Sequence, residues 1–256
     1  MSKRIKNSYF GVVLAIFAAA IGLTSATPYA TLATRAERFY TFGEWESAAA
    51  MYELMLAERS DDATVYARSI VVSGMLGRSD EQIAVVEKSQ SAGIALVDIF
   101  ALVKKDAYSL CHPEIYEHLL LTIKECQPWL RRSINVRLSE YYDSRNNAPK
   151  MVEYADTLLR VRADDVEALS IRARGLMLDS CYDDAMATYR AIVAVDSTAV
   201  DACINLGVYY YQLSRGDLPD APPTVNAADS ARRYLLRAHT LRPTPHLQKL
   251  IDSLSR

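Results

Sequence analysis

Residues 164–197 read DDVEALSIRARGLMLDSCYDDAMATYRAIVAVDS, and this stretch decides the fold because its pattern occurs again before the C-terminus. Ala185, Tyr189 and Ile192 are spaced i, i+4 and i+7, so they line one face of a helix. The small side chain of Ala173 lets a neighbouring helix approach the preceding helix closely. Two short amphipathic helices cannot bury their apolar faces alone, so this unit must stack on others.

The second copy keeps the spacing of the first. Gly207 lies 34 residues after Ala173 and is another small residue. A polar insert that contains prolines, residues 215–226, then separates the two halves of this copy. After the insert, Ala231 and Ala238 repeat the second-helix spacing of the first copy. Tandem copies in one frame predict a repeat protein.

At these residues the chain resembles the tetratricopeptide repeat (TPR), a helix-turn-helix unit of about 34 residues. The matching positions are the small residues Ala173 and Gly207, the turn aromatic Tyr182, the row Ala185, Tyr189 and Ile192, and the closing Pro243. The resemblance implies an all-α fold, a right-handed α-solenoid of stacked TPR-like helix pairs.

The repeat frame predicts three segments. Residues 28–243 form a TPR-like helical repeat domain of about six helix pairs, of which the pair in residues 92–127 is divergent because it lacks the characteristic alanines. Gln82 stands where alanine is usual, which leaves the tightness of that helix pair open. Residues 244–256 form a C-terminal capping helix, since repeat arrays need an end with a polar outer face.

Two β-branched runs allow an α/β alternative. Residues 69–73 and 191–195 could be buried strands by composition. Both runs lie inside longer patterns with the helical period, and neither has turn residues on both sides. We therefore expect helices in both places.

The N-terminal segment differs from the rest of the chain. Lys3, Arg4 and Lys6 are followed by an uncharged, mostly apolar run over residues 9–23, and Ala26 ends a small-residue stretch. Residues 1–26 are therefore read as a signal peptide, with a mature chain that starts after Ala26, or as an uncleaved membrane anchor with a transmembrane helix. Either reading predicts an exported protein of the periplasm or cell envelope. If uncleaved, residues 9–23 would anchor it to the inner membrane.

Composition excludes several function classes. Without the three N-terminal cations the chain has 26 Lys and Arg against 31 Asp and Glu, a net charge of −5, which argues against a nucleic-acid partner. Glycine is sparse, at 9 in 256 residues, and no phosphate-loop, dinucleotide or zinc-protease motif occurs. We expect no cofactor, and a membrane contact only through an uncleaved N-terminal segment.

The cysteines and histidines give no clear metal or disulfide signature. An even number of cysteines in an exported chain allows disulfides, but Cys111 and Cys126 would lie about 22 Å apart along one helix. Separate thiols are therefore favoured for all four cysteines, which include Cys181 and Cys203. His112, Glu114 and His118 match no zinc motif, so no metal site is expected.

Paired aspartates at residues 61–62, 164–165 and 183–184 could suggest glycosidase chemistry. Each pair lies at a turn before a helix, where carboxylates cap helix N-termini. No convergent acid, base or nucleophile is visible in the sequence. The resemblance to the TPR family implies a non-enzymatic scaffold or adaptor for protein–protein interaction in a bacterial-type cell envelope. The alternative is an enzyme built on a helical array, such as a cell-wall hydrolase.

The resemblance also implies a binding surface, because the first helix of each pair lines a concave groove in this family. The corresponding positions are Arg137, Glu140, Arg174, Met177, Asp201, Asn205 and Tyr211. The two arginines could hold a carboxylate, the amide could bond a peptide backbone, and the tyrosine could supply apolar area. The lysine and asparagine set of the family's chaperone-tail clamp is not reproduced. The alternative is a solvated groove, or one occupied by the terminal helix.

Overall fold

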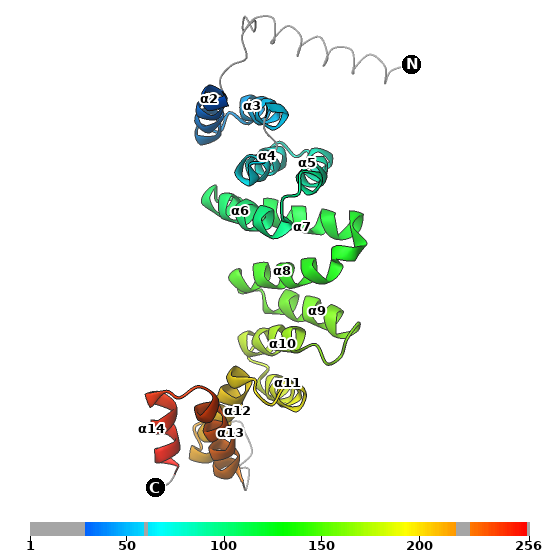
Figure 1. The fold of residues 1–256 in the computed structure, drawn as a ribbon. Coiled ribbons are helices and arrows are strands. Elements are labelled where there is room, and N and C mark those ends of the chain that lie inside the picture. Colours follow the sequence, from blue (N-terminus) through cyan, green and yellow to red (C-terminus); the bar gives the residue numbers. More distant parts are fainter. Residues whose placement is uncertain (1–28, 59–60, 219–225, 255–256) are drawn as a thin grey trace, which may run out of the picture. The chain divides into compact units, whose positions relative to one another are not determined.

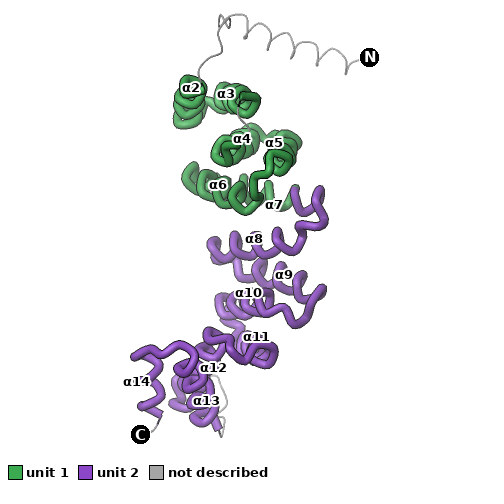
Figure 2. Tube along the Cα trace, in the orientation of Figure 1, with its two compact units in different colours: residues 1–122 green, residues 123–256 purple. Residues whose placement is uncertain are grey.

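A computed structural model describes residues 29–58, 61–218 and 226–254, and every regular element within these ranges is a helix. The chain divides into two compact units, residues 1–122 and 123–256 (Figure 2). The expected fold class, an all-α array of stacked TPR-like helix pairs, is confirmed. Residues 1–26, with the expected cleavage site, lie outside the described ranges. Within those ranges, no helix has the length and apolar character needed to span a membrane.

Unit 1 is built from helices that alternate between two sides. In order they are α2 (Tyr29–Thr41), α3 (Trp45–Glu58), α4 (Ala63–Met75), α5 (Ser79–Ser91), α6 (Leu96–Ser109) and α7 (Glu114–Cys126), whose last residues belong to unit 2. Helix α4 packs against α3, α5 and α6. The first helices of the pairs, α2, α4 and α6, therefore share one side of the unit (Figure 1).

Unit 2 continues the same construction. Its helices are the 3-10 turn η1 (Pro128–Leu130), α8 (Arg131–Ser144), α9 (Ala148–Leu159), α10 (Val166–Leu178), α11 (Tyr182–Val195), α12 (Val200–Arg215), α13 (Ala227–Leu241) and α14 (Pro245–Ser253). Helix α10 packs against α8, α9 and α11, so α8 and α10 are neighbouring first helices. Both β-branched runs, residues 69–73 and 191–195, are helical as expected.

The turn inside every helix pair has the same backbone. One residue in each turn adopts the left-handed conformation, with φ between 53° and 71°: Gly43, Gly77, Cys111, Asn146, Ser180 and Gly216. The next N–H donates to the carbonyl five residues earlier, for example Glu44 N to Phe39 O at 2.9 Å and Cys181 N to Leu176 O at 2.9 Å. This is the Schellman end of a helix. Cys111 follows Gly77 by 34 residues, so the divergent stretch 92–127 keeps the repeat period.

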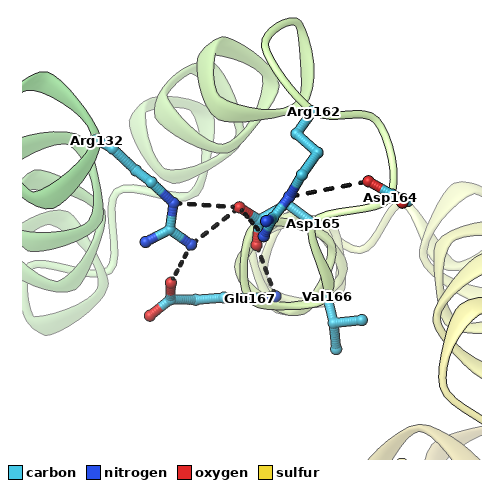
Figure 3. Close-up of a pocket in the computed structure, with 6 residues that line it drawn as sticks. All are labelled: Arg132, Arg162, Asp164, Asp165, Val166 and Glu167. Carbon is cyan, nitrogen blue, oxygen red and sulfur yellow. Dashed lines mark hydrogen bonds and ion pairs between the residues drawn. The ribbon is translucent and has the colours of Figure 1, made fainter.

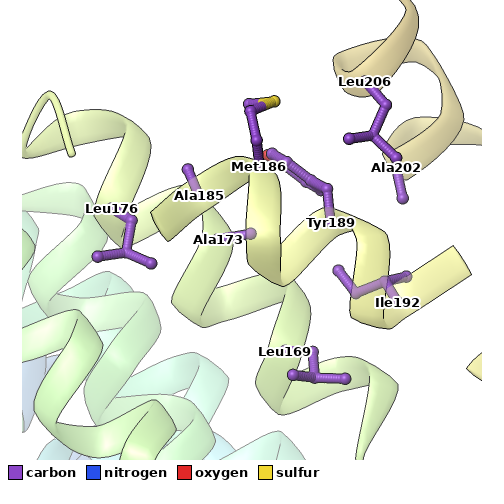
Figure 4. Packing of buried hydrophobic residues seen from close by; sticks show 9 residues of the cluster. All are labelled: Leu169, Ala173, Leu176, Ala185, Met186, Tyr189, Ile192, Ala202 and Leu206. Carbon is purple, nitrogen blue, oxygen red and sulfur yellow. The ribbon is translucent and has the colours of Figure 1, made fainter. Parts of the chain in front are cut away.

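The apolar row that defined the repeat forms the core of unit 2 (Figure 4). The cluster comprises Leu169, Ala173, Leu176, Ala185, Met186, Tyr189, Ile192, Ala202 and Leu206, from three consecutive helices. Ala173 and Ala185 are both fully buried. A helix pair thus buries its face partly against the first helix of the next pair, as stacking requires.

Small residues set the closest helix approaches. A Cβ on Gly207 of α12 would lie 2.7 Å from Cδ2 and 3.2 Å from the backbone N of Leu235 on α13. A Cβ on Gly175 of α10 would lie 2.9 Å from Val152 Cγ2 on α9. Gly207 was expected at a tight contact, whereas Gly175 was not singled out from the sequence.

The helix pair that contains Gln82, whose tightness the sequence left open, is closely packed. The side chain is 2% exposed, and its Nε2 donates to Ile70 O at 3.0 Å. Room for it comes from Gly74 on the facing helix α4, where a Cβ would lie 2.6 Å from Gln82 Nε2. In this pair the small residue is Gly74 on α4, and the residue that faces it is the larger Gln82. The Gln82 amide is satisfied by its hydrogen bond to Ile70 O.

Helix α14 covers the last pair. Leu247 and Ile251 pack with Cys203 of α12 and with Leu235 and Ala238 of α13. The hydroxyl of its N-cap residue accepts a hydrogen bond from Leu247 N at 3.2 Å. Residues 246, 248, 249 and 252 are exposed and polar, so the outer side of the helix faces solvent.

Candidate functional site: the first-helix face of unit 2

The predicted binding residues lie on α8, α10 and α12, and we call their side chains the first-helix face. They are Arg137 and Glu140 on α8, Arg174 and Met177 on α10, and Asp201, Asn205 and Tyr211 on α12. Three of them, the glutamate, Arg174 and the aspartate, are exposed, and the other four are half-buried. Met177 also packs against the core cluster, which ties its side chain to the interior.

Arg174 is already paired with a carboxylate. Its NH2 lies 3.0 Å from Asp143 Oδ2 on α8, and its side chain remains 52% exposed. The sequence predicted that Arg174 is available for a partner's carboxylate, but it did not predict Asp143. A ligand carboxylate at this position would compete with an intramolecular ion pair, which lowers the net gain from binding.

The residues of α12 are also engaged. Asn205 Nδ2 donates to Asp201 O at 2.8 Å within the helix, which uses one amide hydrogen. The Asp201 carboxylate is paired with Arg242, which follows α13. Both side chains therefore have a partner within the protein, although the Asp201 side chain remains 81% exposed.

Tyr211 marks the point where α14 meets the first-helix face. Ser253 Oγ donates to Tyr211 Oη at 3.1 Å, and the Arg215 guanidinium lies 5.8 Å from the ring centroid. The alternative in which the terminal helix covers part of this surface is therefore supported at Tyr211.

A charged cluster lies at the junction of α8 and α10 (Figure 3). Asp165 is 3% exposed, and its Oδ2 lies 2.9 Å from Arg132 NH2 and 2.8 Å from Arg162 NH2. Its Oδ1 accepts from Glu167 N at 3.1 Å and from Ala168 N at 3.3 Å, so it caps α10. Burial opposes ionisation, but the hydrogen bonds from Arg132 and Ala168 hold the pKa of Asp165 below its ordinary value.

The contacts of this cluster indicate that it stabilises the fold. Its cavity of about 370 Å³ is open to solvent and is lined by residues that already pair with each other. The expectation that Asp164–Asp165 caps a helix is confirmed for Asp165, which satisfies two N–H groups of the first turn.

Sequence reasoning missed a row of exposed apolar side chains at the turns between repeats of unit 2. Trp129 is 74% exposed, Val161 88%, Val195 50% and Leu241 43%. Val161 and Val195 are 34 residues apart, and Leu241 follows Val195 by one period plus the insert. The common register of Val161, Val195 and Leu241 in the repeat frame is the signal that could have revealed these three. Trp129 lies 32 residues before Val161 and is outside this register.

The cysteines and histidines form no site among the described residues. All four cysteines are free thiols, with Cys203 buried, Cys181 half-buried and the others exposed. His112 Nδ1 lies 2.7 Å from Glu114 Oε1 at the surface. Within the described ranges, no group of three or more His, Cys, Asp or Glu side chains could hold a metal ion.

No protein-family model matches the chain, and no curated protein matches it. Solved structures do match. A putative protein binding protein from Bacteroides ovatus is 16% identical, with a TM-score of 0.50 over 77% of this chain and 97% of that one. The C-terminal part of a TPR repeat-containing protein from Cytophaga hutchinsonii is 13% identical, with a TM-score of 0.42 over 86% of this chain and 98% of that one.

A tetratricopeptide repeat protein from Parabacteroides merdae is 12% identical, with a TM-score of 0.41 over 89% of this chain and 99% of that one. At these identities the likeness is one of fold. The stacked helix pairs, the shared turn and the 34-residue period show that the chain has the fold of TPR-like helical repeats.

Proposed function

We propose that the chain is a non-enzymatic scaffold that binds a peptide or protein segment on the first-helix face of unit 2. The observation that carries the proposal is the row of accessible charged side chains on neighbouring first helices. Arg174 and Asp201 are 52% and 81% exposed at their side chains, on two different helices. A core position would not expose such groups, and a partner with complementary charge can reach them.

The face suits a segment of mixed charge. Arg137 and Arg174 provide two cations, whereas Glu140, Asp143 and Asp201 provide three carboxylates. A partner's carboxylate would displace Asp143 from Arg174, and a partner's cation would then pair with the released Asp143. Exchange of this kind contributes specificity and a faster association rate more than affinity.

We also propose that the protein acts in the cell envelope. The support is the basic start, the apolar run over residues 9–23 and the small residues up to Ala26. Sequencing of the mature N-terminus tests this, and a chain that starts at Thr27 is the expected result. A full-length product in the membrane fraction would instead indicate the uncleaved anchor, and a full-length product in the cytosol would refute export.

Capture of a partner from the native envelope fraction tests the binding surface. The double variant Arg137→Glu with Arg174→Glu should weaken capture, whereas Arg160→Glu, at the exposed C-cap of α9, is a charge-reversal control that should not. Far-ultraviolet circular dichroism and melting should stay close to the parent for both variants. If the double variant captures the partner as well as the parent does, the site assignment is wrong.

Tyr211 requires a separate comparison because its hydroxyl also contacts α14. Tyr211→Phe removes only the hydrogen bond from Ser253, whereas Tyr211→Ala also removes the ring. A partner that packs on the ring should be lost with alanine and kept with phenylalanine. Equal capture by both variants would place the partner elsewhere, for example on the exposed row that includes Trp129.

A further inference from the structure

The second helices of the first and last pairs carry opposite charge. Helix α3 has three glutamates and no Lys or Arg. Helix α13 has one acid, Asp229, against three arginines: Arg232, Arg233 and Arg237. The second helices between them, α5, α7, α9 and α11, each carry both signs with acids in excess. Among the second helices, an all-acidic charge set is therefore confined to α3, and an excess of cations is confined to α13.

The exposed side of α3 combines carboxylates with an apolar side chain. Glu53 and Glu58 are exposed, and Leu54, one helical turn before Glu58, is 45% exposed. Glu46 Oε1 lies 2.6 Å from Arg78 NH2, so this carboxylate already has a partner. Neither Glu53 nor Glu58 has a cationic partner among the described residues. We call Glu53, Leu54 and Glu58 the α3 face.

The exposed side of α13 has the complementary composition. Arg233 and Arg237 are exposed and one helical turn apart, and Leu236 beside them is 45% exposed. The Arg233 guanidinium lies over the ring of Tyr234, with Cζ 5.0 Å from the ring centroid, a contact that satisfies none of its N–H groups. Neither arginine has a carboxylate partner within the described ranges. We call Arg233, Leu236 and Arg237 the α13 face.

The same separation of charge extends beyond the two helices. Residues 29–122 contain 14 Asp and Glu against 8 Lys and Arg, a net charge of −6. Residues 227–256 contain 6 Lys and Arg against 2 Asp and Glu, a net charge of +4. Opposite charges attract over about 8 Å at physiological ionic strength and speed diffusional encounter. Two copies of the chain therefore attract each other where the acidic part of one approaches the basic part of the other.

We propose that the α3 face of one copy binds the α13 face of a second copy. The two carboxylates of the α3 face pair with the two guanidinium groups of the α13 face, and Leu54 and Leu236 remove apolar area from water. Because the two faces differ, the contact is heterologous, and copies join head to tail into open chains unless they close into a ring. The contact uses neither the first-helix face nor the partner of the proposed function.

The contact is small, which sets its strength. Three side chains on each copy are far fewer than the roughly 20–30 residues a side of a standard interface, so self-association is weak and depends on concentration. Sedimentation velocity of the full chain measures it. The weight-average mass should rise above that of a dimer as concentration increases, and added salt should reverse the rise. A parent that stays monomeric up to about 1 mM overturns the proposal.

Charge reversal tests the pairing of the two faces. Glu53→Arg with Glu58→Arg makes both faces basic, and Arg233→Glu with Arg237→Glu makes both faces acidic. Each double variant should associate at least roughly tenfold more weakly than the parent, because like charges then face each other. The four changes combined exchange the charges of the two faces and should restore association, which a loss of fold would not do. Undiminished association of either double variant, or no recovery in the combined variant, overturns the proposal.

Two controls test whether the effect is specific to these faces. Glu125→Arg with Glu153→Arg, at exposed positions of α7 and α9, changes the net charge as much as the α3 double variant does. Arg137→Glu with Arg174→Glu alters the first-helix face. Both should associate as the parent does, and a loss as large as that of the α3 variant would overturn the proposal.

An anionic membrane is the other occupant that suits a basic face with an exposed leucine. Phosphatidylcholine vesicles with and without phosphatidylglycerol test it by co-sedimentation. Binding only to the anionic vesicles, lost in Arg233→Glu with Arg237→Glu, by a parent that does not self-associate would assign the α13 face to lipid and overturn the second copy as its occupant. Self-association with equal sedimentation in both vesicle types supports the contact between copies.

Discussion

Replacing Gly207 with alanine should destabilise unit 2, although alanine favours helices. The new Cβ would lie 2.7 Å from Leu235 Cδ2, 2.8 Å from Cγ and 3.2 Å from the backbone N. Carbon atoms pack best at about 3.5–4.0 Å, so the contacts are too short by about an ångström. Rotation about χ2 of Leu235 could move Cδ2 away, but Cγ moves only with χ1 of this fully buried side chain, and the backbone N moves only with α13 itself. The two helices must therefore separate.

The magnitude follows from two opposed terms. Overpacking of a tight contact costs about 1–3 kcal/mol. Replacing glycine with alanine inside a helix stabilises the helix by about 1 kcal/mol. The expected net loss is about 1 kcal/mol, which lowers the melting temperature by roughly 2–4 °C for a chain of this size. Thermal and urea unfolding, followed by circular dichroism, measure it.

A double-mutant cycle tests the cause of the loss. Leu235→Ala removes the clashing Cγ and Cδ2 and alone costs about 2–5 kcal/mol. In that background, Gly207→Ala should be neutral or stabilising, because only the helix preference remains. Ser214→Ala, on the exposed side of α12, should change stability by no more than about 0.5 kcal/mol. A Gly207→Ala protein that melts at or above the parent temperature would refute the close approach of α12 and α13.

Three further outcomes are expected. Cys111→Gly and Ser180→Gly should each raise stability by about 0.5–1 kcal/mol in urea titrations, since both residues hold a left-handed φ that glycine adopts without strain; lower midpoints in both would contradict the shared turn. Asp165→Asn should lower the melting temperature near neutral pH and do so much less at about pH 2. Because folding lowers the pKa of Asp165, its carboxylate stabilises the folded state at pH values above the pKa that it has in the unfolded chain. This stabilisation is lost as the pH falls through the pKa of Asp165 in the folded protein. An equal loss of melting temperature at both pH values would exclude an ionic contribution. Ile251→Ala should detach α14, destabilise by about 2–5 kcal/mol and raise the solvent accessibility of the Cys203 thiol to a thiol reagent; an unreactive thiol would show that α14 does not cover it.

The repeat period was predictable because it is a property of the sequence alone. Ala185, Tyr189 and Ile192 follow the helical spacing, and stacking forces such a row into a core whatever it packs against. The shared turn could be predicted only in part from the sequence. Glycine at positions 43 and 77 indicates a left-handed backbone conformation, whereas Cys111 at the equivalent position does not. Backbone strain at a non-glycine residue leaves no compositional signal.

Two contacts that the repeat pattern did not predict have one physical origin. Gln82 fits because Gly74 faces it, and Arg174 has an ion-pair partner because Asp143 lies on the neighbouring helix. In each case the decisive partner is on another helix, and the family pattern specifies positions rather than pairs. The family pattern therefore predicts where a side chain lies, but not whether it already has a partner within the protein.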